Sequence, residues 1–117
     1  MHILIGSRAI KKYYNLENIG DHTDYDIITD QPECFNVDDP KLKKYKLDII
    51  DITDPKLEDP TFRKIHDYCV ANPKALYKTA TFIGDYIELE ICPFNILYGL
   101  LRATLYRILP YGNSQTE

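Results

Sequence analysis

The chain has 117 residues, of which 44% are hydrophobic and 27% charged, and its formal net charge is −4. This length and ordinary composition predict one globular domain and exclude a low-complexity or repeat architecture. The acidic balance argues against binding nucleic acid through a broad basic surface. Four lysines could still form a local basic patch, or simply a solvated face beside a strand: Lys41, Lys43, Lys44 and Lys46.

No apolar run is long enough to span a membrane, and no signal peptide is evident, because Lys11 and Lys12 interrupt the N-terminal apolar stretch. The three cysteines, Cys34, Cys69 and Cys92, are odd in number and lack the C-x-x-C spacing of zinc sites. These features predict a cytoplasmic protein without a membrane-spanning segment or a disulfide framework.

The N-terminal stretch begins with a short apolar run, His2 to Ile5, that is typical of a buried strand. Gly6 allows a sharp turn and a close approach of the backbone to a ligand. Ser7 is a favourable N-cap for a helix that we expect to end near Tyr14. Because the first N–H groups of a helix point outward, this turn predicts an anion site suited to a phosphate.

A second strand is predicted from Tyr25 to Thr29, directly after a turn-rich segment. Asp24 and Asp26 are two residues apart, so an extended backbone places both carboxylates on one face. Two such carboxylates can hold one hard cation between them. The polar segment 30–40, with two prolines, is expected to be an exposed loop.

The third predicted strand, Tyr45 to Ile52, brings two further acids. Alternation places Asp48 and Asp51 on opposite faces, so only one of them can join the first pair. Asp48 is the preferred third acid and Asp51 the alternative; either could instead cap the end of the strand.

Asp59 and Pro60 are typical of a helix start, and Asn72 and Pro73 of its end. The apolar residues Phe62, Ile65 and Cys69 share one face of this helix. His66 lies beside that face, where we expect a partly exposed residue rather than a catalyst.

A β-hairpin is predicted from segments 76–83 and 86–92, joined by a type II′ turn at Gly84 and Asp85. Glu88 and Glu90 share one face of the second arm, as a solvated face or as rival sources of the third acid. Pro93 opens a last helix, with a buried stripe expected at Phe94, Leu97, Leu101, Leu105 and Ile108. We expect one α+β domain over residues 1–112, with a small mixed sheet and flanking helices, and a loose tail over 113–117.

A strand followed by Gly6-Ser7, and then Asp24-x-Asp26 on the next strand, resembles the DNA polymerase beta-type nucleotidyltransferase superfamily, and most closely its small stand-alone members. The resemblance covers roughly the first half of the chain. It implies a nucleotidyltransferase-like fold in which Asp24, Asp26 and Asp48 are catalytic and bind Mg²⁺ or Mn²⁺. It further implies that the nucleoside triphosphate is bound by the turn and the following helix: Gly6, Ser7, Arg8 and Lys11.

The activity implied by the resemblance is transfer of a nucleoside monophosphate to a hydroxyl on a nucleic acid, a protein or a small molecule. Sixteen residues separate Ser7 from Asp24, which is more than is usual in that superfamily. The chain is also small, so a homodimer or a partner chain could complete the site. Two alternatives remain open: a catalytically degenerate relative that serves as a binding or regulatory module, and an unrelated α+β interaction protein.

Overall fold

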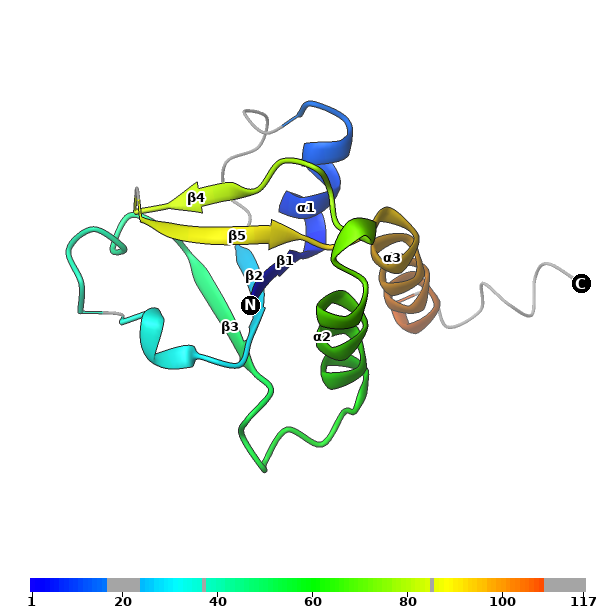
Figure 1. Cartoon of the computed structure of the whole chain (residues 1–117). Helices are drawn as coiled ribbons and strands as arrows, with labels where there is room; N and C mark the ends of the chain where they lie inside the picture. Colours follow the sequence, from blue (N-terminus) through cyan, green and yellow to red (C-terminus); the bar gives the residue numbers. More distant parts are fainter. Residues whose placement is uncertain (17–23, 37, 85, 109–117) are drawn as a thin grey trace, which may run out of the picture.

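The computed structural model describes residues 1–16, 24–36, 38–84 and 86–108, and side-chain surroundings as far as residue 105. The described part is an α+β fold (Figure 1), which confirms the predicted class. In chain order the strands and helices are β1 (His2–Ile5), α1 (Gly6–Tyr13), β2 (Tyr25–Thr29), β3 (Leu47–Asp51), α2 (Thr61–Ala71), β4 (Thr81–Ile83), β5 (Ile87–Ile91) and α3 (Phe94–Ile108). Two short 3₁₀ turns, Pro32–Cys34 and Pro73–Ala75, lie in the connections.

The strands form one mixed sheet in the order β3-β2-β1-β5-β4. β1 lies at the centre, antiparallel to β2 and parallel to β5, while β3 runs parallel to β2. A central strand is covered on both faces, and the apolar run at the N-terminus suits this position: Ile3 and Leu4 are almost completely buried. The core therefore lies around β1, β2 and β5.

The register of the sheet decides which polar side chains meet. Partners across neighbouring strands share a face. Asp26 pairs with Ile5 on one side and with Asp48 on the other. These three residues form a row at the end of the sheet where β1 runs into α1, so Asp26 and the predicted third acid, Asp48, are direct neighbours.

Helix α1 is short and is held in place by its last turn. Tyr13 donates a hydrogen bond of 2.7 Å from its hydroxyl to the carbonyl of Cys92, just after β5. Its ring also packs edge-on against Tyr77 and Phe94. Burial raises the pKa of Tyr13 to about 12, so the hydroxyl remains a donor at neutral pH. These contacts join the start of the chain to the beginning of α3.

The β2–β3 connection is less exposed than its polar composition predicted. Phe35 and Leu42 are buried core residues, and Phe35 packs edge-on against the ring of His2. The segment ends against the hairpin, where Tyr45 accepts a hydrogen bond from the backbone of Gly84. The prediction of a wholly exposed loop over 30–40 is therefore wrong at Phe35, because this crossover covers part of the sheet.

Several other boundaries differ from the predicted ones. The first hairpin arm is a strand only from Thr81 to Ile83, although the backbone N–H of Tyr77 still donates a hydrogen bond to the carbonyl of Ile91 in β5. Gly84 has the positive φ of 60° that a type II′ turn requires, whereas Asp85 and the tail 113–117 lie outside the described residues. Of the predicted α3 stripe, Leu97 is fully buried and Phe94, Leu101 and Leu105 are exposed, while the side chain of Ile108 lies outside the described ones. Among the described helices, none is both long and apolar enough to cross a membrane.

Candidate functional site

A pocket of about 680 Å³ opens where the start of α1 meets the first residues of β2 and β3. Its polar end is formed by Gly6 and Ser7 together with Asp26 and Asp48. The opposite wall is apolar and comes mainly from α2 and α3: Phe62, Leu97, Leu100 and Leu101. The pocket therefore brings together the Gly-Ser turn and two of the three predicted acids, although they come from three different elements.

Gly6 is required by its backbone conformation and by its neighbour. Its φ of 75° lies in the left-handed region, which glycine adopts without strain. A Cβ atom at this position would also collide with Oδ2 of Asp26. The absence of a side chain is thus what allows the Asp26 carboxylate to lie against the turn.

Asp26 and Asp48 are neighbouring carboxyl groups that share a hydrogen bond when one of them is protonated and repel each other when both are charged. Burial raises the pKa of Asp26 to about 6, and the charge of Asp48, its hydrogen bond and the charge of Asp24 raise it in the same direction. No cationic side chain contributes to this shift among the described groups. Two carboxylates this close favour sharing a proton, and a divalent cation would satisfy the same charge.

Ser7 lies inside the helix and does not cap it. Helix α1 begins at Gly6, with Ile5 in the N-cap position and no side-chain hydrogen bond there. The prediction that Ser7 is the N-cap is therefore wrong by two positions. The consequence for the site is small, because the exposed Ser7 side chain and the first N–H groups of α1 still lie at the polar end of the pocket.

The remaining predicted residues lie outside the pocket lining. Asp24 is exposed just before β2 and acts on Asp26 only through its charge. Arg8 stacks over the ring of Tyr25 at 4.2 Å and donates to its hydroxyl at 3.3 Å. Lys11 lies in the last turn of α1, away from the Gly-Ser end. The structure thus brings together four of the seven predicted site residues.

The rival sources of a third acid lie elsewhere. Asp51 accepts hydrogen bonds from the backbone and hydroxyl of Thr53, so it closes the turn after β3. Glu88 and Glu90 line a different pocket, beside His2 and Cys34. Of the four residues left open by the sequence, only Asp48 adjoins Asp26 across the sheet.

Two residues at or near the site, one in the pocket lining and one in the connection beside it, were not recognised from the sequence in this role. Asp59 also lines the pocket, and its carboxylate accepts a hydrogen bond from the N–H of Thr61 at the start of α2. Arg63 donates to three backbone carbonyls of the β3–α2 connection, those of Ile52, Asp54 and Leu57. The N-cap pattern at Asp59 could have marked it as a candidate, whereas no local pattern predicts the three bonds of Arg63.

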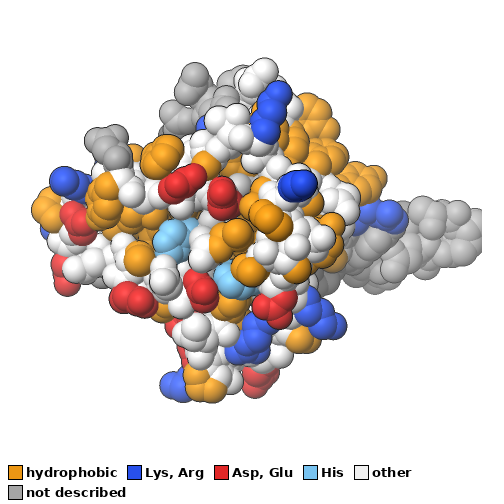
Figure 2. Space-filling model, in the orientation of Figure 1, with side chains coloured by type: hydrophobic (Ala, Val, Ile, Leu, Met, Phe, Trp, Pro, Cys, Tyr) orange, Lys and Arg blue, Asp and Glu red, His pale blue; other side chains and the backbone are white. Residues whose placement is uncertain are grey.

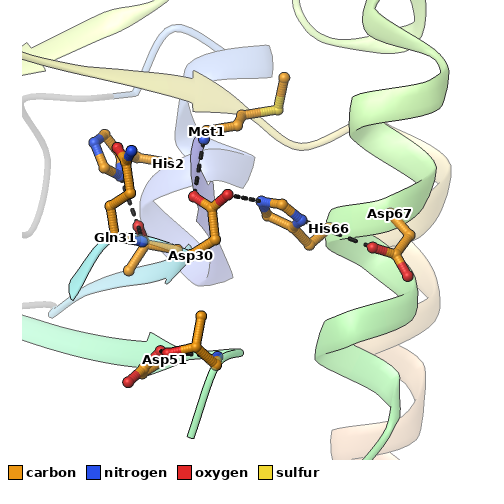
Figure 3. Close-up of polar contacts among 9 residues, drawn as sticks. Met1, His2, Asp30, Gln31, Asp51, His66 and Asp67 are labelled. Atoms are coloured by element: carbon orange, nitrogen blue, oxygen red, sulfur yellow. Dashed lines mark hydrogen bonds and ion pairs between the residues drawn. The ribbon is translucent and has the colours of Figure 1, made fainter.

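A second polar cluster lies at the other end of β2 (Figure 3). Asp30 accepts a hydrogen bond from the Met1 amine at 3.1 Å, and Nε2 of His66 lies 3.8 Å from its other oxygen. His66 is only 6% exposed, and its Nε2 has no hydrogen-bond partner among the described residues. The expectation of a partly exposed His66 is therefore wrong, because α2 packs this residue against β2.

In the described part of the chain, no group of three or more His, Cys, Asp or Glu side chains is arranged to hold a metal ion. A cation here would therefore depend on Asp26 and Asp48, two neighbouring carboxyl groups; the raised pKa of Asp26, to which no described cationic group contributes, suits a divalent cation with oxygen ligands. Comparison of the chain with protein-family models, with curated proteins and with solved structures finds no match.

Proposed function

We propose that this chain is a Mg²⁺- or Mn²⁺-dependent nucleotidyltransferase of the DNA polymerase beta type, which transfers a nucleoside monophosphate from a nucleoside triphosphate to a hydroxyl. The observation that supports this most is the meeting of the Gly6-Ser7 turn with Asp26 and Asp48 in one pocket. An anion site beside a pair of unneutralised carboxylates is the combination that a metal-bound triphosphate requires.

Each residue has a defined part in this proposal. Asp26 and Asp48 would hold the cation, and Asp24 would add its charge from the rim of the site. A bound divalent cation would neutralise the phosphate charge and stabilise the attacking and leaving oxygens. The N–H groups at the start of α1 and the Ser7 hydroxyl would bind phosphate oxygens. The acceptor oxygen bonds to the α-phosphorus, pyrophosphate leaves, and the hydroxyl proton passes to solvent.

The scaffold around these groups favours the same chemistry. Gly6 leaves room for the Asp26 carboxylate beside the turn. Arg63 holds the β3–α2 connection, which carries Asp59 at the pocket. The apolar wall from α2 and α3 would exclude water from one side of the bound nucleotide or acceptor. Basic side chains are scattered over the face seen in Figure 2 and form no broad patch there, so that face gives no support to a nucleic-acid acceptor.

A degenerate relative that binds a nucleotide without turnover is the second candidate. The specific observations that favour it are the position of Asp24 outside the pocket lining and the engagement of Arg8 with Tyr25. Both candidates require the cation site, and only the first requires turnover, so one set of variants separates them.

The first experiment follows thermal unfolding while Mg²⁺ or Mn²⁺ is titrated. At ten times the dissociation constant, a single site stabilises the fold by about 1.4 kcal/mol, or roughly 5–10 °C for a chain of this size. We expect this rise in the wild type, and we expect Asp26→Asn and Asp48→Asn to lack it. Glu88→Gln is the matched control, because Glu88 is an exposed strand acid outside this pocket.

The second experiment measures metal-dependent transfer from α-labelled nucleoside triphosphates to the protein itself or to added cell extract. Label that depends on Asp26 and Asp48 but not on Glu88 supports the transferase. Metal binding without any transfer supports the degenerate candidate. A wild type whose melting temperature ignores both metals, or variants that keep the full rise, would refute the cation site and both candidates with it.

A further inference from the structure

Helix α3 carries an apolar stripe that the described part of the chain covers only in part. Its four members are between 36% and 52% exposed and follow one another at intervals of four, three and four residues: Phe94, Tyr98, Leu101 and Leu105. Spacing of this kind keeps the side chains on one side of a helix and is the pattern by which helices pack against each other. The stripe therefore has the geometry of an interface between helices.

The stripe borders the face that holds α3 to the fold. Leu97 is 2% exposed and belongs to the core, and Ile96 and Leu100 pack against that core. Phe94 and Leu101 lie at the border, since Phe94 also packs against Tyr13 of α1 and Leu101 also lines the pocket, whereas Tyr98 and Leu105 are more exposed. Solubility alone does not account for four large apolar side chains in this stripe.

Aromatic rings extend the stripe at its N-terminal end. Tyr14, which is 59% exposed, packs against Phe94 at 5.9 Å between ring centroids, and Phe94 stacks on Tyr98 at 6.5 Å. The leucines Leu101 and Leu105 occupy the other end. The surface thus has an aromatic half and an aliphatic half along one helix.

We infer that this surface binds a second copy of the same chain, with the two α3 helices antiparallel. A two-fold axis between Tyr98 and Leu101 places the aromatic half of each helix on the aliphatic half of the other, so that Phe94 meets Leu105 and Tyr98 meets Leu101. Such self-complementarity is the requirement of a two-fold interface. An unrelated partner would not need this division of one stripe into two matching halves.

The antiparallel arrangement also gives Arg102 a polar neighbour. Helix α3 contains no acidic residue, and Arg102 lies at the side of the stripe, 5.8 Å from the ring of Tyr98. The antiparallel pair places Arg102 beside Asn95 of the other copy, whose side-chain carbonyl accepts hydrogen bonds.

The exposed area is sufficient for a weak dimer. Aromatic side chains bury about 150–250 Å² each when fully covered. At their observed exposure, Tyr14 and the four residues of the stripe together present on the order of 500 Å² of accessible surface per copy. Two copies would then bury about 1,000 Å², near the lower limit of specific interfaces. We expect a dissociation constant on the order of 10 µM. Because Leu101 also lines the pocket, the second copy would lie beside the pocket mouth.

The test measures the mass of the full chain in solution by sedimentation equilibrium, over concentrations that span the expected constant. The wild type should change from monomer to dimer. Tyr98→Glu and Leu105→Glu should weaken dimerisation at least about tenfold, which corresponds to about 1.4 kcal/mol. Both positions lie outside the pocket lining, so cation binding should be unchanged. Val70→Glu, at an exposed aliphatic residue of α2, is the matched control and should dimerise as the wild type does.

A pair of complementary variants tests the antiparallel register. Phe94→Glu and Leu105→Lys should each be monomeric alone. Mixing them should restore a heterodimer, because the carboxylate introduced in one chain then meets the ammonium group introduced in the other. A wild type that stays monomeric well above the expected constant would overturn the inference, as would a dimer that survives the Tyr98 and Leu105 substitutions. A mixture that stays monomeric would refute the antiparallel pairing.

Discussion

Asp26 and Asp30 lie four residues apart at the two ends of β2 and have opposite electrostatic surroundings. Asp26 faces other acids, and burial together with the charge of Asp48 raises its pKa to about 6. At Asp30 burial also acts to raise the pKa, but the hydrogen bond and charge of the Met1 amine, together with the charge of His66, outweigh it and lower the pKa. The Asp26 carboxylate is repelled by neighbouring acids, whereas the charge of Asp30 is neutralised by the Met1 amine.

The difference shows that electrostatic repulsion is concentrated at the Asp26 end of β2. The requirements of folding alone do not explain this repulsion. An ion pair such as Met1–Asp30 contributes modestly to stability and needs no further purpose. A pair of like charges beside a glycine turn reduces stability in the absence of a counter-ion, and perturbed acids of this kind cluster at functional sites. The three substitutions below would break or sharpen this contrast.

The largest effect is expected at the glycine that makes room for Asp26. Gly6→Ala would force alanine to adopt a φ of 75° and would place its Cβ against Oδ2 of Asp26. We expect a loss of about 2–3 kcal/mol in the free energy of unfolding, measured by urea denaturation. Gly99→Ala is the matched control, because nothing lies within 4 Å of that position in α3. It should be neutral or stabilising by up to about 1 kcal/mol, and equal effects at the two sites would contradict the close approach.

An intermediate effect is expected from removing the repulsion itself. The folded-state pKa of Asp26 lies above its ordinary value of 3.8, so the folded chain binds a proton more tightly than the unfolded chain. Stability contributed by this group is therefore present below about pH 4 and lost as the pH rises through about 6. Asp26→Asn should remove that loss, because an amide can donate to Asp48 without a charge.

The comparison is made by measuring the free energy of unfolding of both proteins between about pH 4 and pH 8 without divalent cations. Because Asp26 is partly exposed, solvent screening reduces the expected gain of the variant to about 1 kcal/mol at pH 8, with little gain at pH 4. Added Mg²⁺ should reverse the order at neutral pH by stabilising only the wild type. A variant less stable than the wild type under alkaline conditions without metal would show that the pair is not under repulsion.

The smallest effect is expected at the neutralised end. The folded-state pKa of Asp30 is lowered, so its contribution is present above its ordinary pKa and lost as the pH falls through the folded value. Asp30→Asn should destabilise the chain by less than about 1 kcal/mol at pH 7 and have no effect at strongly acidic pH. The same unfolding series measures it. A stabilising Asp30→Asn would remove the contrast between the two ends of β2.

Much of the secondary structure could be predicted because its causes are local. The run from Tyr25 to Thr29 is a strand with the predicted limits. Helix α2 begins close to the predicted start, although its N-cap is Pro60 and not Asp59, whose carboxylate accepts a hydrogen bond from the N–H of Thr61. In α3 the apolar periodicity wrongly predicted burial of Phe94, Leu101 and Leu105. An apolar stripe indicates that a helix face can pack against another surface, but it does not tell whether that surface belongs to the same chain. The burial of Phe35 and His66 depended on a crossover and on helix packing that no local pattern reports.

The candidate site divides in the same way. Gly6, Ser7 and Asp26 were recognisable from residue type and order alone, because a strand, a tight turn and alternating carboxylates are short-range features. The sequence left four acids open as the third member, and the strand register selected Asp48 as the neighbour of Asp26. The folded structure also places Asp24, Arg8 and Lys11 outside the pocket lining, although all three are close to Gly6, Ser7 or Asp26 in the sequence.

The amino-acid sequence by itself determined an α+β domain whose first strand ends in a glycine turn and whose second begins with paired acids. Only the tertiary structure decided that β3 pairs with β2 so that Asp48 meets Asp26, and that α2 and α3 supply the opposite wall of the pocket. The physical reason is distance along the chain. Turns and alternation are set by neighbouring residues, whereas the pKa of Asp26 and the exposure of the α3 stripe depend on residues that only folding brings close.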